Sequence, residues 1–161
     1  MSPRPLSDSL VLLSIRPEFA SLIRKGQKRA EFRRRYHPRL ASFPIILYET
    51  APAQRFSLWI TLHDIVCDAP ARLWSRFGHL NGTDRQPFDL YFNGAEMGSA
   101  LLLDHVQSFD EPLSLHEARR TSNNYRPPQS YTILKDDHPL HKIIANRPRS
   151  NPEELPCLPV S

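Results

Sequence analysis

The stretch GQKRAEFRRR, residues 26–35, holds the densest group of reactive side chains in the sequence. It places one carboxylate, Glu31, among five basic side chains: Lys28, Arg29, Arg33, Arg34 and Arg35. Arginine and lysine neutralise phosphates, and a carboxylate beside them can accept a proton or simply pair with them. The residues alone allow three interpretations: a solvated charged strand, a clamp for a polyanion, or the floor of a catalytic cleft.

The charge of the chain is concentrated around this stretch. The 161 residues carry a net charge of +4, and between Arg24 and Arg39 eight lysines and arginines face the single acid Glu31. Such a cluster permits nucleic-acid binding without requiring it. The two cysteines, Cys67 and Cys157, have neither metal-ligand nor disulfide-framework spacing, so no metal or other cofactor is expected.

The N-terminal apolar run is too short for a signal sequence or a membrane span. We therefore expect a cytoplasmic protein with no membrane partner.

Hydrophobic periodicity predicts the elements that position the basic stretch. Residues 10–15 form an apolar run typical of a buried strand, and Pro17 and Gly26 bracket a short helix over 17–25. Residues 29–36 alternate, so Ala30 and Phe32 face the core while Glu31 and Arg33 share the other face. Further strands are predicted over 44–50, 56–67, 99–109 and near 131–134, with short helices over 69–77 and 114–119.

Strands and helices do not alternate regularly, which favours an α+β fold with a mostly antiparallel, barrel-like sheet. We expect three parts: a flexible N-terminus (1–9), a folded domain (10–134) and a Pro-rich, disordered tail (135–161). Within the tail, we expect Ile143 and Ile144 to form a local docking point. A regulatory adaptor that recruits a partner protein through this tail is one functional hypothesis.

The segment LLSIRPEFASLIRKGQKRAEFRRR resembles the opening of the ASCH family, small domains related to the PUA RNA-binding barrel. Tyr48 with Pro52 resembles the end of the family's next strand motif, and LW (73–74), YFNG (91–94) and PPQSY (127–131) resemble a longer subgroup. The resemblance covers residues 10–134. It implies a PUA-like, small mixed or antiparallel β-barrel with two or three short helices.

The resemblance also implies functional residues. One family branch hydrolyses acetylated cytidine with a lysine and a threonine; Lys28 matches the lysine, whereas Glu31 occupies the threonine position. Ribonuclease-like members use a tyrosine, a lysine and a serine. Tyr48 and Ser130 match two of these, and Gln54 with Arg55 stands at the lysine position.

The predicted catalytic residues are therefore Lys28, Glu31, Tyr48 and Ser130. The predicted nucleic-acid contacts are Arg29, Arg33, Arg34, Arg35 and Arg55.

The leading hypothesis is an ASCH domain that binds single-stranded or structured RNA, or a nucleotide, in a basic cleft, with weak ribonuclease activity. It expects Lys28, Arg33, Tyr48, Arg55 and Ser130 on one concave rim, with Tyr48 stacked on an unpaired base. The alternative is an amidohydrolase acting on a modified, acetylated nucleoside, with Lys28 and Glu31 in hydrogen-bond reach. Structural roles compete with each assignment, since Tyr48 can sit at the core edge and Ser130 can brace a turn.

Overall fold

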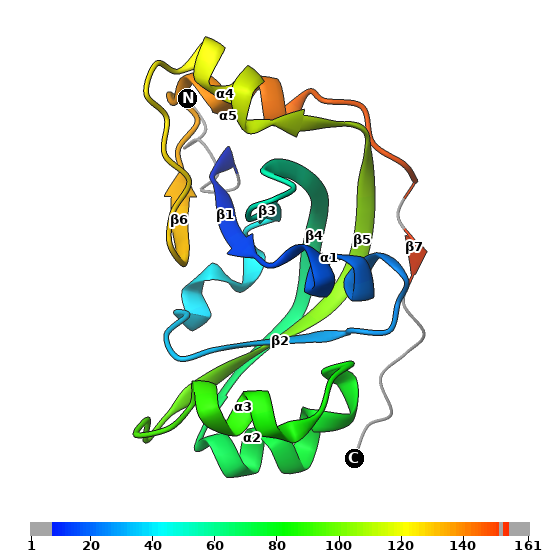
Figure 1. Cartoon of the computed structure of the whole chain (residues 1–161), viewed down its shortest axis with the longest axis vertical. Coiled ribbons are helices and arrows are strands. Elements are labelled where there is room, and N and C mark those ends of the chain that lie inside the picture. Colours follow the sequence, from blue (N-terminus) through cyan, green and yellow to red (C-terminus); the bar gives the residue numbers. More distant parts are fainter. Residues whose placement is uncertain (1–7, 152, 155–161) are drawn as a thin grey trace, which may run out of the picture.

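The computed structural model describes residues 8–151 and 153–154 (Figure 1). Its strands are β1 (Leu10–Ile15), β2 (Ala30–Arg33), β3 (Ile45–Glu49), β4 (Arg55–Asp68), β5 (Gly98–Ser114), β6 (Tyr131–Leu134) and β7 (Glu153–Glu154). Its α-helices are α1 (Pro17–Arg24), α2 (Pro70–Phe77), α3 (Arg85–Tyr91), α4 (Leu115–Thr121) and α5 (Pro139–Ala145). Two 3₁₀ turns, η2 (Pro38–Ser42) and η3 (Gly78–Leu80), complete the described elements.

The strands form one curled sheet in the order β2-β5-β4-β3-β1-β6, and β7 adds to β5. β1 pairs with β3 in parallel, and every other pairing is antiparallel. The long strands β4 and β5 shift register at three places, and such bulges bend and twist a sheet. The α+β, PUA-like fold predicted from the sequence is confirmed as a half-barrel. It has five α-helices among the described residues, more than the two or three expected.

β1 lies between two cores because both of its faces are apolar. Val11, Leu13 and Ile15 face the cluster under α1. Leu10 and Leu12 face a second cluster, which α4 and α5 cover in Figure 1. A third cluster, beneath α2 and α3, packs against β2 and β5. β1 is therefore a fixed support, with all six residues buried.

The end of α1 directs the basic stretch toward the sheet. Pro17 occupies the first turn, and Gly26 adopts a left-handed conformation with φ 74°, which ends the helix. The backbone N–H groups of Gln27 and Lys28 then both donate to the carbonyl of Leu22. This tight turn points the chain into β2, two residues later.

The expectation of a disordered tail from residue 135 is wrong for residues 135–151. Leu140 and Ile144 of α5 are fully buried in the cluster that contains Leu10 and Leu12. Leu140, Ile143 and Ile144 lie at i, i+3 and i+4, a helical spacing that the prolines on either side obscure. The predicted docking point, Ile143 and Ile144, is thus part of α5. Most of the segment that was expected to recruit a partner protein is instead packed on the domain. Residues 1–7, 152 and 155–161 lie outside the described part of the chain.

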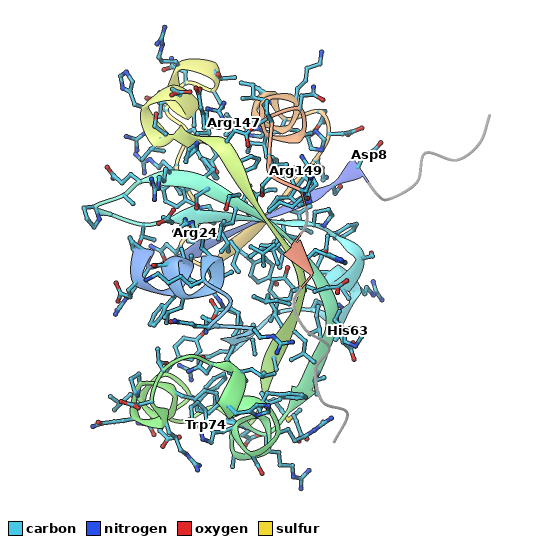
Figure 2. The ribbon with its side chains drawn as sticks, turned by 90° about the vertical axis from the view of Figure 1, so that its right-hand side faces the viewer. Asp8, Arg24, His63, Trp74, Arg147 and Arg149 are labelled. Carbon is cyan, nitrogen blue, oxygen red and sulfur yellow. The ribbon has the colours of Figure 1, made fainter. Side chains whose placement is uncertain are left out.

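The segment after α5 is also fastened to the sheet (Figure 2). The Arg149 guanidinium stacks on the Trp59 ring, 3.8 Å from its centroid. Arg147 donates to the backbone carbonyls of Glu111 and Pro112 at 2.5 and 3.3 Å. These contacts complete the fold beyond the predicted domain end at 134.

No helix in the described ranges is long and apolar enough to cross a membrane.

Replacing Ile144 with alanine tests whether α5 belongs to the core. We expect Ile144→Ala to lower the free energy of unfolding by about 2–5 kcal/mol, because a fully buried side chain leaves a cavity. The measurement is urea denaturation of the full chain. Ile133→Ala is the matched control, since Ile133 is exposed on β6. Equal effects of the two substitutions would contradict the packing of α5.

Candidate functional site

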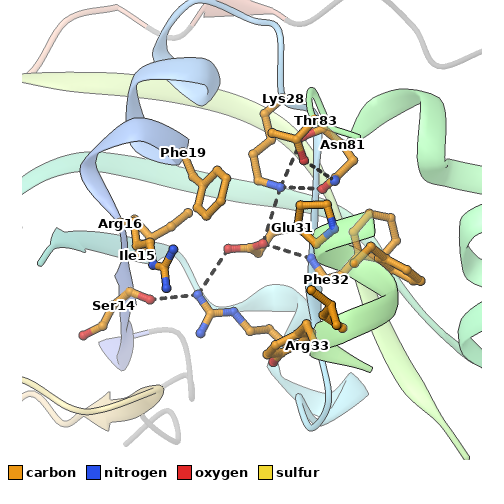
Figure 3. Close-up of a pocket in the computed structure, with 14 residues that line it drawn as sticks. Ser14, Ile15, Arg16, Phe19, Lys28, Glu31, Phe32, Arg33, Asn81 and Thr83 are labelled. Carbon is orange, nitrogen blue, oxygen red and sulfur yellow. Dashed lines mark hydrogen bonds and ion pairs between the residues drawn. The ribbon is translucent and has the colours of Figure 1, made fainter. Parts of the chain in front are cut away.

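A pocket of about 450 Å³ opens between the end of β1, α1, β2 and α3 (Figure 3). Fourteen residues line it: Ser14, Ile15, Arg16, Phe19, Lys28, Glu31, Phe32, Arg33, Asn81, Thr83, Pro87, Phe88, Leu90 and Tyr91. Its charged side chains come from β2 and from the segments just before α1 and β2, and most of its apolar side chains come from α3. Three of the predicted site residues, Lys28, Glu31 and Arg33, therefore share one cavity.

Lys28 is a buried cation at the floor of this pocket, with 3% of its surface exposed. Its Nζ donates to Asn81 Oδ1 at 2.8 Å and lies 3.5 Å from Glu31 Oε1. The Asn81 amide is itself fixed, because Nδ2 donates to Thr83 Oγ1 at 2.7 Å. The Phe19 ring lies 5.6 Å from Nζ, within cation–π range. The ammonium group is thus held in place from several sides.

Glu31 carries the balancing negative charge. Its Oε1 accepts from the Phe32 backbone N–H at 3.0 Å, and its Oε2 accepts from Arg33 Nη2 at 3.1 Å. Burial alone would raise the pKa of this carboxyl. The charges of Lys28 and Arg33, the Arg33 hydrogen bond and the Phe32 N–H outweigh burial and lower the pKa below its ordinary value of 4.5. Glu31 is therefore an ionised carboxylate at neutral pH.

Arg33 joins the two open edges of the half-barrel. It lies on the edge strand β2, and its Nη2 donates to the Ser14 carbonyl of β1 at 2.8 Å. Its Nη1 lies 3.5 Å from Ser130 Oγ, just before the other edge strand, β6. Ser14 Oγ donates to the Pro128 carbonyl at 2.6 Å and holds this loop against β1. A side chain thus bridges a seam that backbone pairing does not close.

The cluster of Lys28, Glu31 and Arg33 carries a net charge of +1. Arg16, whose side chain is 74% exposed, adds a second unit of positive charge to the lining. Arginine donors suit phosphate and carboxylate oxygens, so the polar side of the pocket fits an anion. In the described ranges, no group of three or more His, Cys, Asp and Glu could hold a metal ion.

Tyr48, Arg55 and Ser130 do not line this pocket, in contrast to the rim expected from the sequence, although Ser130 lies beside Arg33. Tyr48 is 4% exposed and packs on Phe56 at 4.9 Å between ring centroids, in the core beneath α4 and α5. Burial raises the pKa of its phenol, so the hydroxyl stays protonated at neutral pH. Because the side chain is buried, it has no exposed ring face on which an RNA base could stack. Arg55 donates to the buried Glu49 carboxylate at 2.9 Å, which Arg24 also contacts.

The other basic residues of the stretch 26–35 differ in exposure, and none of them lines the pocket. Arg34 and Arg35 are exposed beyond the end of β2, and Arg29 is half-buried. The Arg34 backbone N–H donates to Tyr91 Oη at 3.1 Å. Arg34 therefore supports the pocket wall through its backbone.

Sequence reasoning missed the contribution of residues 81–91. Asn81 fixes Lys28, and α3 supplies the wall opposite β2. The Asn81–Gly82 dipeptide is the feature of the sequence that could have predicted a tight turn here. Gly82 has φ 77°, and a Cβ there would lie 2.9 Å from the Gln27 carbonyl oxygen. Only glycine lets this turn approach the Lys28 segment so closely.

The comparisons with known proteins agree with this fold. The ASCH domain model matches residues 13–92. A protein of Zymomonas mobilis described as an ASCH domain-containing ribonuclease is 35% identical over 134 residues, which cover 83% of this chain and 89% of that protein. The chain belongs to the ASCH family.

Crystal structures of the ASCH protein from Zymomonas mobilis are similar in fold to most of this chain. One has a TM-score of 0.77 and 32% identity, and the match covers 88% of this chain and 97% of that one. A variant of that protein with one serine changed to alanine has a TM-score of 0.77 at 32% identity, covering 85% and 95%.

Glu31→Gln tests the role of the buried carboxylate in stability. At neutral pH we expect a loss of about 3–5 kcal/mol in the free energy of unfolding, because Lys28 stays buried without a counter-charge. The folded-state pKa of Glu31 is lowered, so its contribution is complete above pH 4.5 and is lost as the pH falls through the folded-state value. Urea denaturation of both proteins across a pH series measures the difference.

The matched control is Glu18→Gln, which removes a carboxylate from an exposed pair with Arg16. We expect no measurable change from it, since surface ion pairs contribute little. A difference between wild type and Glu31→Gln that stays constant into acid would contradict the ion-pair assignment.

Proposed function

We propose that the pocket binds a single-stranded or looped segment of RNA and cleaves it slowly. The main support is the net positive charge that Lys28 and Arg33 retain around Glu31 in a pocket with apolar walls. A cavity of about 450 Å³ suits one nucleotide unit far better than a duplex. The description of a 35% identical relative as a ribonuclease supports the same class of ligand.

Binding depends on phosphate contacts with Arg16 and Arg33. The exposed Arg16 guanidinium can turn to a phosphate at the entrance, whereas Arg33 is already held by Glu31 and the Ser14 carbonyl. Ser130 is exposed and lies beside Arg33, where its hydroxyl can donate to the same phosphate. Each phosphate that is neutralised releases counterions, so affinity falls as salt rises.

Cleavage requires a proton acceptor for the 2′-hydroxyl and cations for the phosphorane. Glu31 accepts the 2′-hydroxyl proton, the 2′-oxygen bonds to phosphorus, and the bond to the 5′-oxygen breaks. Arg33 stabilises the added negative charge, and the Lys28 ammonium gives a proton to the leaving oxygen. The products are a 2′,3′-cyclic phosphate and a 5′-hydroxyl. The lowered pKa of Glu31 makes it a poor base, which fits slow turnover.

Arg16→Gln tests the binding step without disturbing the buried cluster. We expect a several-fold loss of affinity for a fluorescent single-stranded RNA, and a salt dependence whose slope falls by about one unit. Arg120→Gln on α4 is the control, because it removes the same charge from an exposed residue outside the pocket. Equal effects of the two substitutions, or affinity that ignores salt, would contradict RNA binding in this pocket.

The same RNA with 2′-deoxy sugars separates cleavage from binding. It should bind with similar affinity and remain intact, while the RNA yields cyclic phosphate detected by mass spectrometry. Glu31→Gln should slow cleavage about a hundredfold or more, the usual contribution of a general base. Cleavage of the deoxy strand would contradict this chemistry.

A second candidate is hydrolysis of an acetylated nucleoside. It is favoured by one observation: Lys28 Nζ lies 3.5 Å from Glu31 Oε1 at the floor of a pocket of nucleoside size. Glu31 would take a proton from water, the hydroxide would add to the acetyl carbonyl, and the C–N bond would break as Glu31 passes that proton to the leaving nitrogen. Acetate and the free amino group would result. No acyl-enzyme forms, because Glu31 stands where the resemblance places a threonine nucleophile.

Incubation with N4-acetylcytidine tests this candidate. We expect wild type to release acetate, measured by proton NMR, and Glu31→Gln to lose that activity because no base remains for the water. Arg120→Gln is the control, since Arg120 is exposed on α4 and does not line the pocket. The absence of acetate release by folded wild-type protein would eliminate the amidohydrolase.

A further inference from the structure

We propose that Leu90 and Tyr91, at the end of α3, form a stacking wall for one unpaired base. Arg16 and Arg33 would hold the phosphate of the same nucleotide. This inference rests on the proposed RNA binding and assigns the contact that distinguishes a nucleotide from other anions. It replaces Tyr48, which the fold buries, as the aromatic contact.

The exposure of these two side chains is the first observation. Across the described residues, the large apolar side chains that are exposed are Leu90 (72%), Met97 (55%), Ile133 (44%) and Tyr91 (43%). Leu90 and Tyr91 are neighbours in sequence, and both line the pocket. Phe88, one turn earlier, is buried in the core. The helix thus packs through one face and presents apolar surface to the cavity with another.

The wall is held rigidly by aromatic contacts. The Phe88 ring lies edge-on to Phe32, with centroids 5.0 Å apart and an interplanar angle of 86°. It also contacts Trp74 at 5.0 Å and Phe92 at 4.5 Å. These contacts fix α3 to β2, the strand that carries Glu31 and Arg33. The apolar wall and the charged floor therefore keep a constant separation.

The Tyr91 ring is fixed at both ends. It meets Phe92 edge-on at 4.8 Å and 85°, and its Oη accepts from the Arg34 backbone N–H at 3.1 Å. A second link, from Arg34 Nη2 to the Asn93 carbonyl at 3.4 Å, ties the turn after α3 to the same strand end. Little side-chain freedom remains to be lost when a ligand binds, so a stacked base gains most of the contact energy.

The distribution of polarity in the pocket selects the occupant. A free phosphate uses only the cationic groups, and a purely apolar ligand leaves the net positive charge around Glu31 unbalanced. A nucleotide supplies both a phosphate and a flat apolar face. Stacking accepts every base, because each has a π face. The wall therefore accounts for affinity toward unpaired nucleotides of any sequence.

Competition against a fluorescent single-stranded RNA tests the wall. The competitors are the four nucleoside 5′-monophosphates and ribose 5-phosphate, which carries the phosphate without a base. For wild type we expect the nucleotides to compete roughly tenfold better than ribose 5-phosphate, the size of one stacking contact. Tyr91→Ala should reduce that ratio to about threefold or less, and Leu90→Ala should reduce it in the same direction.

Two substitutions serve as controls. Tyr91→Phe keeps the ring and should keep the ratio, although it loses the bond from Arg34. Met97→Ala removes a comparably exposed side chain outside the pocket and should change nothing. Urea denaturation verifies that each variant is folded.

The outcomes separate this inference from the function on which it rests. An unchanged ratio in Tyr91→Ala, with salt-dependent RNA binding intact, overturns the stacking wall and leaves RNA binding in place. Failure of wild type to bind RNA at all overturns the proposed function and the wall with it. A ratio that falls in Tyr91→Ala and persists in Tyr91→Phe and Met97→Ala supports the assignment.

Discussion

The ion pairs of the largely buried Glu31 carboxylate with Lys28 and Arg33 are the interactions on which the rest of the site depends. Lys28 is almost entirely removed from water, and a charged ammonium in such a position is costly without an opposite charge. Glu31 supplies that charge and at the same time accepts from Arg33. One anion therefore orients two cations that would otherwise repel each other. Side chains alternate along β2, so Glu31 and Arg33 lie on the same face and their side chains can pair directly.

The sheet topology explains why the cluster lies where it does. β2 and β6 are the two ends of the six-strand order, and the curl of the sheet brings them near each other without backbone pairing. Arg33 reaches from β2 to the Ser14 carbonyl and toward Ser130, so a side chain fastens the seam. The pocket opens beside this seam: Ser14 and Arg33 belong to both, whereas no residue of β6 is in the lining.

Local patterns in the sequence predict the local parts of this arrangement. β1, α1 and the alternating β2 follow from apolar periodicity, Pro17 and Gly26, and they bring Lys28, Glu31 and Arg33 together. Tyr48 illustrates what alternation cannot decide, because β3 is buried on both faces and its pattern does not show which side meets the ligand. α5 was missed since flanking prolines obscure a short i, i+3, i+4 pattern.

The remaining errors come from contacts between distant residues. The sequence predicts Arg55 as a nucleic-acid contact, yet its guanidinium pairs with Glu49, a buried acid at the end of the neighbouring strand β3. Asn81 and Tyr91 complete a pocket whose floor lies more than fifty residues earlier. Their types are ordinary for a turn and a short helix, so only the fold shows that they face Lys28 and Arg33.

The charge balance of the pocket limits what charge alone can achieve there. Glu31 cancels one of the two cations that it contacts, and Arg34 and Arg35, which belong to the basic cluster of the sequence, lie outside the lining. A polyanion clamp built from so few cations would be weak at physiological salt. Under the proposed function, discrimination between nucleotides and other anions then depends on a contact that salt does not screen. The exposed apolar end of α3, fixed to the same strand as the cations, is the surface that meets this requirement.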